Sequence, residues 1–174
     1  MLKRLIFFLA CLLSLNFIGS QKALASHAMG VDLTYICLGN NEYVFTISFY
    51  RDCSGINAPG TASLNLSSIS CSQNFNVVLP QISSQEISAL CPTALSTCQG
   101  GFEPGAEQYI YSDTITLPAQ CTDWVFSWSH CCRNPLITNL SNPANENIYI
   151  EATYDNTIPG CNSSPIFTTH PVPY

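Results

Sequence analysis

Hydrophobic and polar residues alternate along two neighbouring stretches, 31–35 and 43–50. The apolar positions that recur at every second residue are Val31, Leu33, Tyr35, Tyr43, Phe45, Ile47 and Phe49. The run Gly39-Asn40-Asn41 lies between the stretches, and Gly and Asn readily adopt positive φ angles in tight turns. The pattern predicts a β-hairpin with one face packed on a core and the other more polar.

Further along the chain, similar short runs alternate with turn signals. Strands are predicted near residues 62–69, 75–79, 108–117, 123–129 and 147–154. Pro-Gly pairs punctuate the chain between several of them. Only residues 83–90 have spacing that suits a short helix. About seven short strands with regular turns are typical of an antiparallel β-sandwich, Ig-like or jelly-roll-like, and predict an all-β fold.

The first 25 residues follow a different pattern. Lys3 and Arg4 precede an apolar run over residues 5–15, and Ala23-Leu24-Ala25 is a small-x-small cleavage site. This arrangement predicts a signal peptide at residues 1–25, with residues 26–174 as a single domain. A membrane anchor is disfavoured, because polar residues interrupt the run before the roughly 20 apolar residues that a span requires.

The predicted mature chain, residues 26–174, has a strongly negative net charge. Arg51 and Arg133 are the only Lys or Arg residues there, against eleven carboxylates. Nucleic acids and anionic lipids are bound by clustered cations. The composition therefore excludes a nucleic-acid-binding role and predicts no membrane insertion once the signal peptide is removed.

Cysteines are frequent in the predicted mature chain. Of the ten in the sequence, Cys11 lies in the signal peptide. The others are Cys37, Cys53, Cys71, Cys91, Cys98, Cys121, Cys131, Cys132 and Cys161. In an exported chain such a set predicts a disulfide framework. The odd number leaves one thiol free, or pairs it with a cysteine of another chain or of sequence not present here.

Spacing gives partial guidance on pairing. Cys91 and Cys98 enclose a short loop and are predicted to form a local bridge. Cys37 and Cys53 lie roughly 30 Å apart along the first hairpin, so they are not expected to bridge each other. Most other pairings remain open.

Adjacent residues Cys131 and Cys132 are expected to seek different partners, because consecutive strand residues point to opposite faces. Their neighbour His130 raises zinc binding or Cys–His catalysis as alternatives. No C-x-x-C pair is present, and export favours disulfides over zinc.

Motifs of catalysis are also missing. The sequence has no G-x-S-x-G motif and no EF-hand loop. The pairs Glu103 with Glu107 and Asp113 with Asp123 are interpreted as solvated acids rather than as the two carboxylates of a glycosidase. We predict no enzyme activity, no catalytic residues, no metal and no cofactor.

Two tryptophans, Trp124 and Trp128, share one face of the predicted strand 123–129. Aromatic residues so placed either pack in a core or form a platform on which a sugar stacks. Alternation along the strand favours the core, and the platform remains the alternative.

Several motifs together resemble a known family. They are found in residues 26–35, 50–53 (Tyr-Arg-Asp-Cys), 129–134 (Ser-His-Cys-Cys-Arg-Asn), 137–139 (Ile-Thr-Asn) and 170–174 (His-Pro-Val-Pro-Tyr). The combination resembles the N-terminal module of large secreted, PKD-repeat, adhesin-like proteins of Bacteroidetes that are associated with gliding motility.

The resemblance implies a surface-exposed or secreted protein. Members of the family usually continue into PKD-like repeats and a type IX sorting domain. We therefore expect this chain to be a truncated N-terminal part of a longer protein, and to be periplasmic if it is complete without a sorting domain.

The two mature arginines adjoin cysteine-bearing segments. A guanidinium binds a carboxylate through two parallel hydrogen bonds. We predict that Arg51 and Arg133 each pair structurally with a carboxylate such as Asp52 or Asp123.

Taken together, these patterns predict a non-catalytic extracellular structural or adhesion module. Its partner would be a surface glycan or another cell-surface protein. A carbohydrate-binding accessory module of a secreted hydrolase is the alternative, and a small secreted enzyme is a more distant one.

Overall fold

Seven antiparallel β-strands make up nearly all the regular structure of the described residues, 27–166 of a computed structural model. The strands are β1 (Ala28–Gly39), β2 (Glu42–Asp52), β3 (Thr61–Ser68), β4 (Gln73–Glu86), β5 (Ala106–Thr116), β6 (Trp124–Cys131) and β7 (Asn147–Tyr154). Two single turns of 3₁₀ helix, Thr97–Gln99 and Pro143–Asn145, complete them. The prediction of an all-β, disulfide-bearing fold is confirmed, whereas the predicted signal peptide lies outside the described residues.

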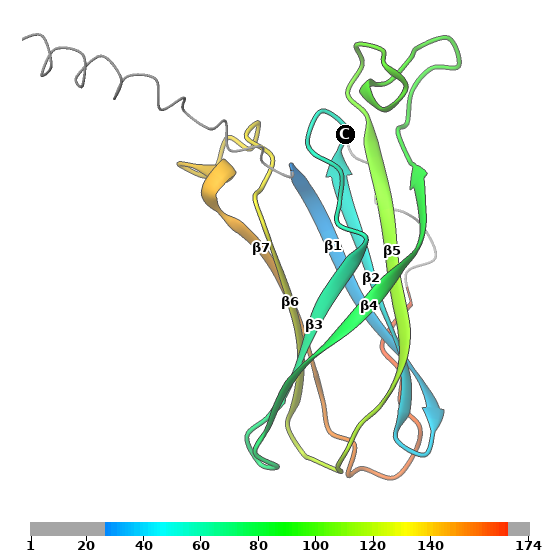
Figure 1. Ribbon diagram of the computed structural model, residues 1–174, viewed down its shortest axis with the longest axis vertical. Helices are drawn as coiled ribbons and strands as arrows, with labels where there is room; N and C mark the ends of the chain where they lie inside the picture. Colours follow the sequence, from blue (N-terminus) through cyan, green and yellow to red (C-terminus); the bar gives the residue numbers. More distant parts are fainter. Residues whose placement is uncertain (1–26, 167–174) are drawn as a thin grey trace, which may run out of the picture.

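The strands form one sheet that folds over on itself, in the order β1-β2-β5-β4-β3-β6-β7 (Figure 1). Strand β4 belongs to both layers, because Leu79 and Pro80 pair with β3 and Gln81 pairs with β5. A register shift follows between Gln81 and Ser83. Pro80 lies beside this irregularity, where a residue without an N–H is tolerated in a sheet. We call β1, β2 and β5 the β1 layer, and β3, β6 and β7 the β7 layer.

Aromatic side chains from both layers meet in the core. The ring centroids of Phe45 and Phe126 lie 4.7 Å apart, and those of Tyr35 and Tyr154 lie 5.3 Å apart. The Tyr43 hydroxyl donates to the Tyr154 hydroxyl at 3.1 Å. Edge-to-face and tilted aromatic pairs add to the stability gained from burying their area. The apolar residues at alternate strand positions, which the sequence pattern predicted to share one face, therefore point inward between the two layers, as in a sandwich.

The predicted helix over residues 83–90 is wrong. Strand β4 continues to Glu86, far beyond the predicted end at residue 79, and pairs with β5 through Ser83, Ser84 and Gln85. This part of β4 is exposed or half-buried on both sides. A strand with little buried surface shows no period-two pattern, so the wider spacing of its apolar residues suggested a helix instead.

The antiparallel strands bring the connecting segments together at two ends. At the upper end in Figure 1, which we call the motif end, the connections are 53–60, 87–105 and 132–146. At the opposite end, which we call the turn end, they are 40–41, 69–72, 117–123 and the segment after residue 154. The family-like motifs 50–53 and 129–134 both lie at the motif end.

Candidate functional site

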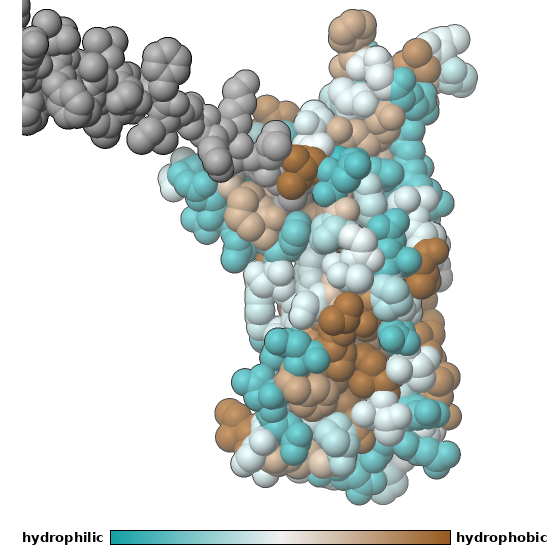
Figure 2. Space-filling model, viewed as in Figure 1, coloured by the Kyte–Doolittle hydropathy of each residue, from teal (hydrophilic) through white to brown (hydrophobic). Residues whose placement is uncertain are grey.

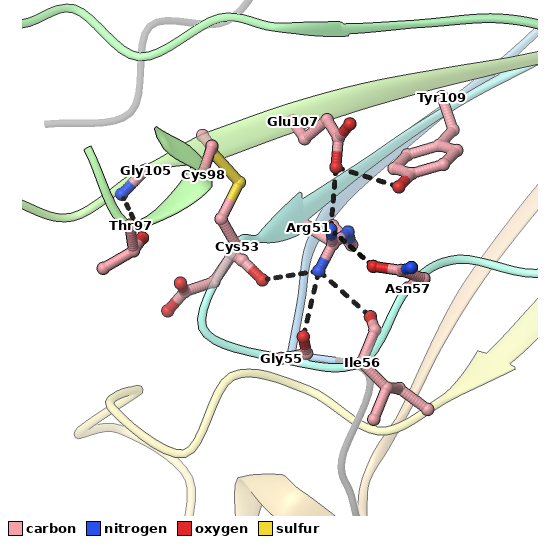
Figure 3. Close-up of polar contacts among 12 residues, drawn as sticks. Arg51, Cys53, Gly55, Ile56, Asn57, Thr97, Cys98, Gly105, Glu107 and Tyr109 are labelled. Atoms are coloured by element: carbon pink, nitrogen blue, oxygen red, sulfur yellow. Dashed lines mark hydrogen bonds and ion pairs between the residues drawn. A yellow bond between two sulfur atoms is a disulfide. The ribbon is translucent and has the colours of Figure 1, made fainter. Parts of the chain in front are cut away.

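Arg51 is the centre of the motif end. Its side chain is buried near the end of β2, with a relative exposure of 6%, and its Nη2 donates to Glu107 Oε2 of β5 at 2.8 Å (Figure 3). The guanidinium also lies 5.6 Å from the ring centroid of Tyr109, close enough for a cation–π contact. The prediction of a structural carboxylate partner for Arg51 is correct in kind, but the partner is Glu107 and not the adjacent Asp52.

The same guanidinium organises the loop that follows β2. Its Nη1 donates to the carbonyl oxygens of Gly55 and Ile56, both at 3.1 Å, and Nη2 donates to Asn57 Oδ1 at 3.2 Å. Buried backbone carbonyls require such donors. Figure 3 shows the three acceptors gathered below Arg51, opposite Glu107. The charge of Arg51 is thus used to fold the loop 53–57 against β5.

Glu107 links this arrangement to Tyr109. The Tyr109 hydroxyl donates to Glu107 Oε2 at 2.8 Å, so one carboxylate oxygen accepts from both Tyr109 and Arg51. Burial, followed by this hydrogen bond, raises the pKa of Tyr109 above its usual value. The Tyr109 phenol therefore stays protonated and serves as a donor.

Asp52 ties the two family-like motifs together. Its Oδ1 accepts from the backbone N–H of Ser54 at 2.8 Å and from the Ser54 hydroxyl at 2.7 Å. Its Oδ2 accepts from Asn134 Nδ2 at 3.0 Å, and His27 Nδ1 lies 3.9 Å away. The hydrogen bond between Asp52 and Asn134 spans 82 positions in the sequence. It joins the end of β2 to the segment after β6.

The start of β1 lies in the same place. Ala28 donates from its N–H to the Cys132 carbonyl at 3.0 Å and accepts from the Asn134 N–H at 3.1 Å. Asn134 Oδ1 accepts in turn from the Leu136 N–H at 2.9 Å. We call the set Arg51, Asp52, Glu107 and Asn134 the clamp, because it gathers β1, β2, β5 and the segment after β6.

Chemically, most polar atoms of the clamp bind other parts of the protein, although the buried Nε of Arg51 has no hydrogen-bond partner among the described residues. Both oxygens of Asp52 and one oxygen of Glu107 accept hydrogen bonds from the chain. Five acceptors surround the two terminal nitrogens of Arg51. Within residues 27–166, no three His, Cys, Asp or Glu side chains are grouped so that they could hold a metal ion. The arrangement supports a structural role for these residues.

Asp123 and Arg133 do not form the other predicted pair. Asp123 Oδ1 accepts from the Ser68 hydroxyl at 2.6 Å, and Oδ2 accepts from the N–H groups of Ile69 and Ser70. These hydrogen bonds, led by that from Ser68, lower the pKa of Asp123 to about 2. Asp123 therefore caps the β3–β4 turn at the turn end, on the far side of the molecule from Arg133.

Disulfides join four pairs of the candidate cysteines in the described part of the chain. The bridges are Cys37–Cys161, Cys53–Cys98, Cys71–Cys121 and Cys131–Cys132, and Cys91 is free and exposed. The prediction that Cys37 and Cys53 do not bridge each other is confirmed. Each of the first three bridges closes a loop of tens of residues and holds segments that are distant in sequence.

Two of the pairing predictions are wrong. Cys98 bridges Cys53 and not Cys91, because the loop 87–105 folds back onto the end of β2, where the Cys53 N–H donates to the Gly105 carbonyl at 2.9 Å. Cys131 and Cys132 bridge each other, and the peptide bond between them is cis. Cys131 is the last residue of β6, so the alternation of strand side chains does not extend to Cys132.

The two tryptophans are core residues and do not form a platform. Trp124 is fully buried and Trp128 is 5% exposed. The ring of Trp128 stacks on His130 with centroids 5.4 Å apart, and burial lowers the pKa of His130. The platform alternative for Trp124 and Trp128 is therefore wrong, and His130 packs as a neutral aromatic group.

A polar pocket of about 650 Å³ lies at the turn end. The turn 39–41 and the segment 156–161 line it, with Gln120 beside them. The Asn156 side chain, which is buried, accepts from the Cys121 N–H at 2.6 Å and donates to the Ala119 carbonyl at 3.0 Å. Its polar atoms are thus used in holding the loop before β6.

Hydrophobic side chains gather at one place on the surface and also lie singly at loop tips (Figure 2). Figure 2 shows brown side chains near the middle of the face in view and at the tips of loops. Exposed apolar residues include Val78 and Ile82 on β4, each 61% exposed, and Phe102 in the loop 87–105, whose side chain is fully exposed. Single exposed apolar residues are common on soluble proteins.

Comparison with protein-family models, curated proteins and solved structures found no match to this chain. The resemblance to gliding-associated adhesin-like proteins therefore stays a prediction.

Proposed function

We propose that the chain is a non-catalytic extracellular module, part of a surface or secreted adhesin-like protein. The observation that carries the proposal is the clamp. Arg51, Asp52 and Asn134 belong to the most distinctive motifs of the sequence, and they bind other segments of the chain. Residues whose side chains hold other segments of the chain in this way support a scaffold role.

The disulfides support an oxidising compartment. Disulfides persist in extracellular and periplasmic proteins and are rare in the cytosol. Four are formed between residues 37 and 161. No helix among residues 27–166 is long and apolar enough to cross a membrane. The disulfides are compatible with a secreted, surface or periplasmic location.

The core and the cross-links also suit a binding scaffold. Cys37 and Cys161 are 124 positions apart, and in the chain-entropy model closing such a loop stabilises the fold by about 4–5 kcal/mol. A rigid sheet positions surface side chains with little loss of conformational entropy on binding. We propose that the partner is a surface glycan or another cell-surface protein.

Location and activity test the proposal together. The full chain, expressed in the cells that encode it, should be accessible on intact cells to antibody and to added protease. The purified chain should adhere to a partner surface and turn over no generic ester or glycoside substrate.

Variants of the clamp provide the control for activity. Turnover that Asp52→Asn or Glu107→Gln abolishes, in a chain whose circular dichroism is unchanged, would contradict a non-catalytic module. A chain found only in the cytosol with reduced cysteines would contradict the extracellular location.

A further inference from the structure

The outward face of the β7 layer has a continuous row of polar side chains. The inward residues of β3, β6 and β7 form the core, so the alternate residues face solvent. Register places Asn76, Asn65, Ser127 and Glu151 side by side across β4, β3, β6 and β7. Neighbouring strands lie about 4.8 Å apart, so the row is about 14 Å long.

One aromatic ring stands beside this row. Tyr149 is on β7, two residues before Glu151, and is 56% exposed. Its hydroxyl donates to Glu151 Oε2 at 2.6 Å. This hydrogen bond is the main reason that the pKa of Tyr149 lies above its usual value, and a hydrogen bond from Ser127 partly offsets it. The Tyr149 side chain is thus tied to the polar row by its hydroxyl while more than half of the residue is exposed to solvent.

Three asparagines form the other part of the row. Asn65 Nδ2 donates to the side-chain oxygens of Asn74 at 2.9 Å and of Asn76 at 3.0 Å. An asparagine amide has two donor hydrogens and one acceptor oxygen. The arrangement uses the oxygens of Asn74 and Asn76 as acceptors and keeps their NH₂ groups as donors, with Asn65 Oδ1 as a further acceptor.

The chemistry of this face suits a neutral glycan. We propose that the outer face of the β7 layer, built on Tyr149, Glu151 and the asparagines 65, 74 and 76, binds a neutral oligosaccharide. The apolar C–H face of a sugar ring stacks on an exposed aromatic ring, and amide and carboxylate groups bind the hydroxyls at its edge. The length of the row fits a short chain of sugars rather than a single one.

The charge of this outer face disfavours acidic ligands. Arg51 lies in the clamp, and Arg133 follows β6 at the motif end. The outward positions of β3, β6 and β7, and of the part of β4 that pairs with β3, contain no Lys or Arg and only one carboxylate, Glu151. An acidic polysaccharide or a phosphorylated ligand would meet Glu151 with no cation to bind it. A protein partner is disfavoured, because protein interfaces depend on several buried aromatic or Arg anchors, and Tyr149 is the one aromatic residue here.

This inference rests on the proposed function, since it names the ligand of the same non-catalytic module. The full chain, made in an oxidising compartment, is applied to an array of neutral oligosaccharides (β-glucan, xylan, mannan and chitin fragments) and acidic ones (alginate and heparin fragments). Binding of at least one neutral probe and of no acidic probe is expected. The affinity for the best neutral probe is then measured by titration calorimetry.

Variants locate the site. Tyr149→Ala should weaken binding by about tenfold or more, as is usual for a central aromatic contact. Tyr149→Phe should retain most of the affinity, because the ring remains. Asn65→Ala should cost about two- to tenfold, the range of a net hydrogen bond. Phe102→Ala removes a fully exposed aromatic ring from the loop 87–105, away from the proposed site, and should change nothing.

Several results would overturn the inference. They are no binding to any neutral probe, stronger binding to an acidic probe, equal affinity of wild type and Tyr149→Ala, or equal losses in Tyr149→Ala and Phe102→Ala. Adherence to protein-coated surfaces without any glycan binding would also reject it, while leaving the proposed module intact. Cleavage of a probe glycan, seen by mass spectrometry, would instead contradict the proposed function.

Discussion

Each end of the molecule has two disulfides, but the two ends differ in their polar contacts. At the motif end a buried ion pair and side-chain hydrogen bonds gather β1, β2, β5 and the segment after β6, whereas at the turn end a carboxylate caps a surface turn. Arg51 and Asp52 make the interior contacts of the motif end. At the turn end Asp123 caps a surface turn, and two bridges, Cys37–Cys161 and Cys71–Cys121, hold the segments.

Substitutions at the two ends should therefore destabilise the fold for different physical reasons. Removing one partner of a buried ion pair leaves the other charge without compensation and is strongly destabilising. A long-range bridge acts largely by restricting the unfolded chain, so its loss lowers the free energy of unfolding of the whole fold. The comparison indicates that the motif end depends on exact side-chain identity in addition to its bridges Cys53–Cys98 and Cys131–Cys132. The turn end depends mainly on the bridges Cys37–Cys161 and Cys71–Cys121.

The largest effect is expected at the turn end. Replacing Cys37 and Cys161 together by serine should lower the free energy of unfolding by about 4–5 kcal/mol, because the unfolded chain regains the freedom of a long loop. Urea denaturation measures the loss. The matched control is Cys91→Ser, which removes an exposed free thiol and should leave stability unchanged. Equal stability of the double variant and the wild type would show that this bridge does not hold the end.

At the motif end, Arg51→Met should cost about 3 kcal/mol. The change leaves Glu107 without its cation and the carbonyls of Gly55 and Ile56 without a donor. Arg51→Lys should also destabilise, since one ammonium cannot replace the planar fork. A double-mutant cycle with Glu107→Gln isolates the pair, and a coupling near zero would argue against it.

A smaller loss is expected from Asn134→Ala, about 1–3 kcal/mol. The variant removes the donor to Asp52 Oδ2 and the acceptor of the Leu136 N–H. Asn142→Ala is the matched control, because Asn142 is an exposed residue of the same connection whose side chain makes no cap hydrogen bond. If both variants melt at the same temperature, Asp52 and Asn134 do not link the motifs.

The smallest effect concerns pH and Asp123. Its pKa is lowered to about 2 in the folded protein, against about 3.9 in an unfolded chain. The ionised form therefore favours folding: the contribution is complete above about pH 4 and disappears as the pH falls towards 2. The difference in melting temperature between wild type and Asp123→Ala should shrink over that range. A difference that stays constant from pH 5 to pH 2 would contradict this account.

Much of the fold could be predicted from the sequence because burial on one side imposes a period of two. Strand β7 has the predicted bounds, and β3, β5 and β6 differ by a few residues. The second half of β4 was missed, since it lies at the switch between layers and buries little on either side. Local patterns carry no information where neither face is buried.

The site was less predictable, because its contacts join distant positions. The motifs containing Asp52 and Asn134 are visible in the sequence, but their contact depends on how β2 and β6 are placed in the fold. The bridge Cys53–Cys98 depends in the same way on the path of the loop 87–105. Tyr149 had a usable signal, since its neighbours Ile148 and Ile150 face the core and alternation leaves its ring outside.

The cross-link between Cys37 and Cys161 also determines how the molecule would carry mechanical load. Strands β2 to β7 all lie between the two bridged residues in the sequence. Tension applied at residues 27 and 166 would pass through the covalent bridge and extend only the short segments outside it. While the bridge is oxidised, strands β2 to β7 would stay folded under a pull that separates the ends, and only the part of β1 before Cys37 would be drawn out.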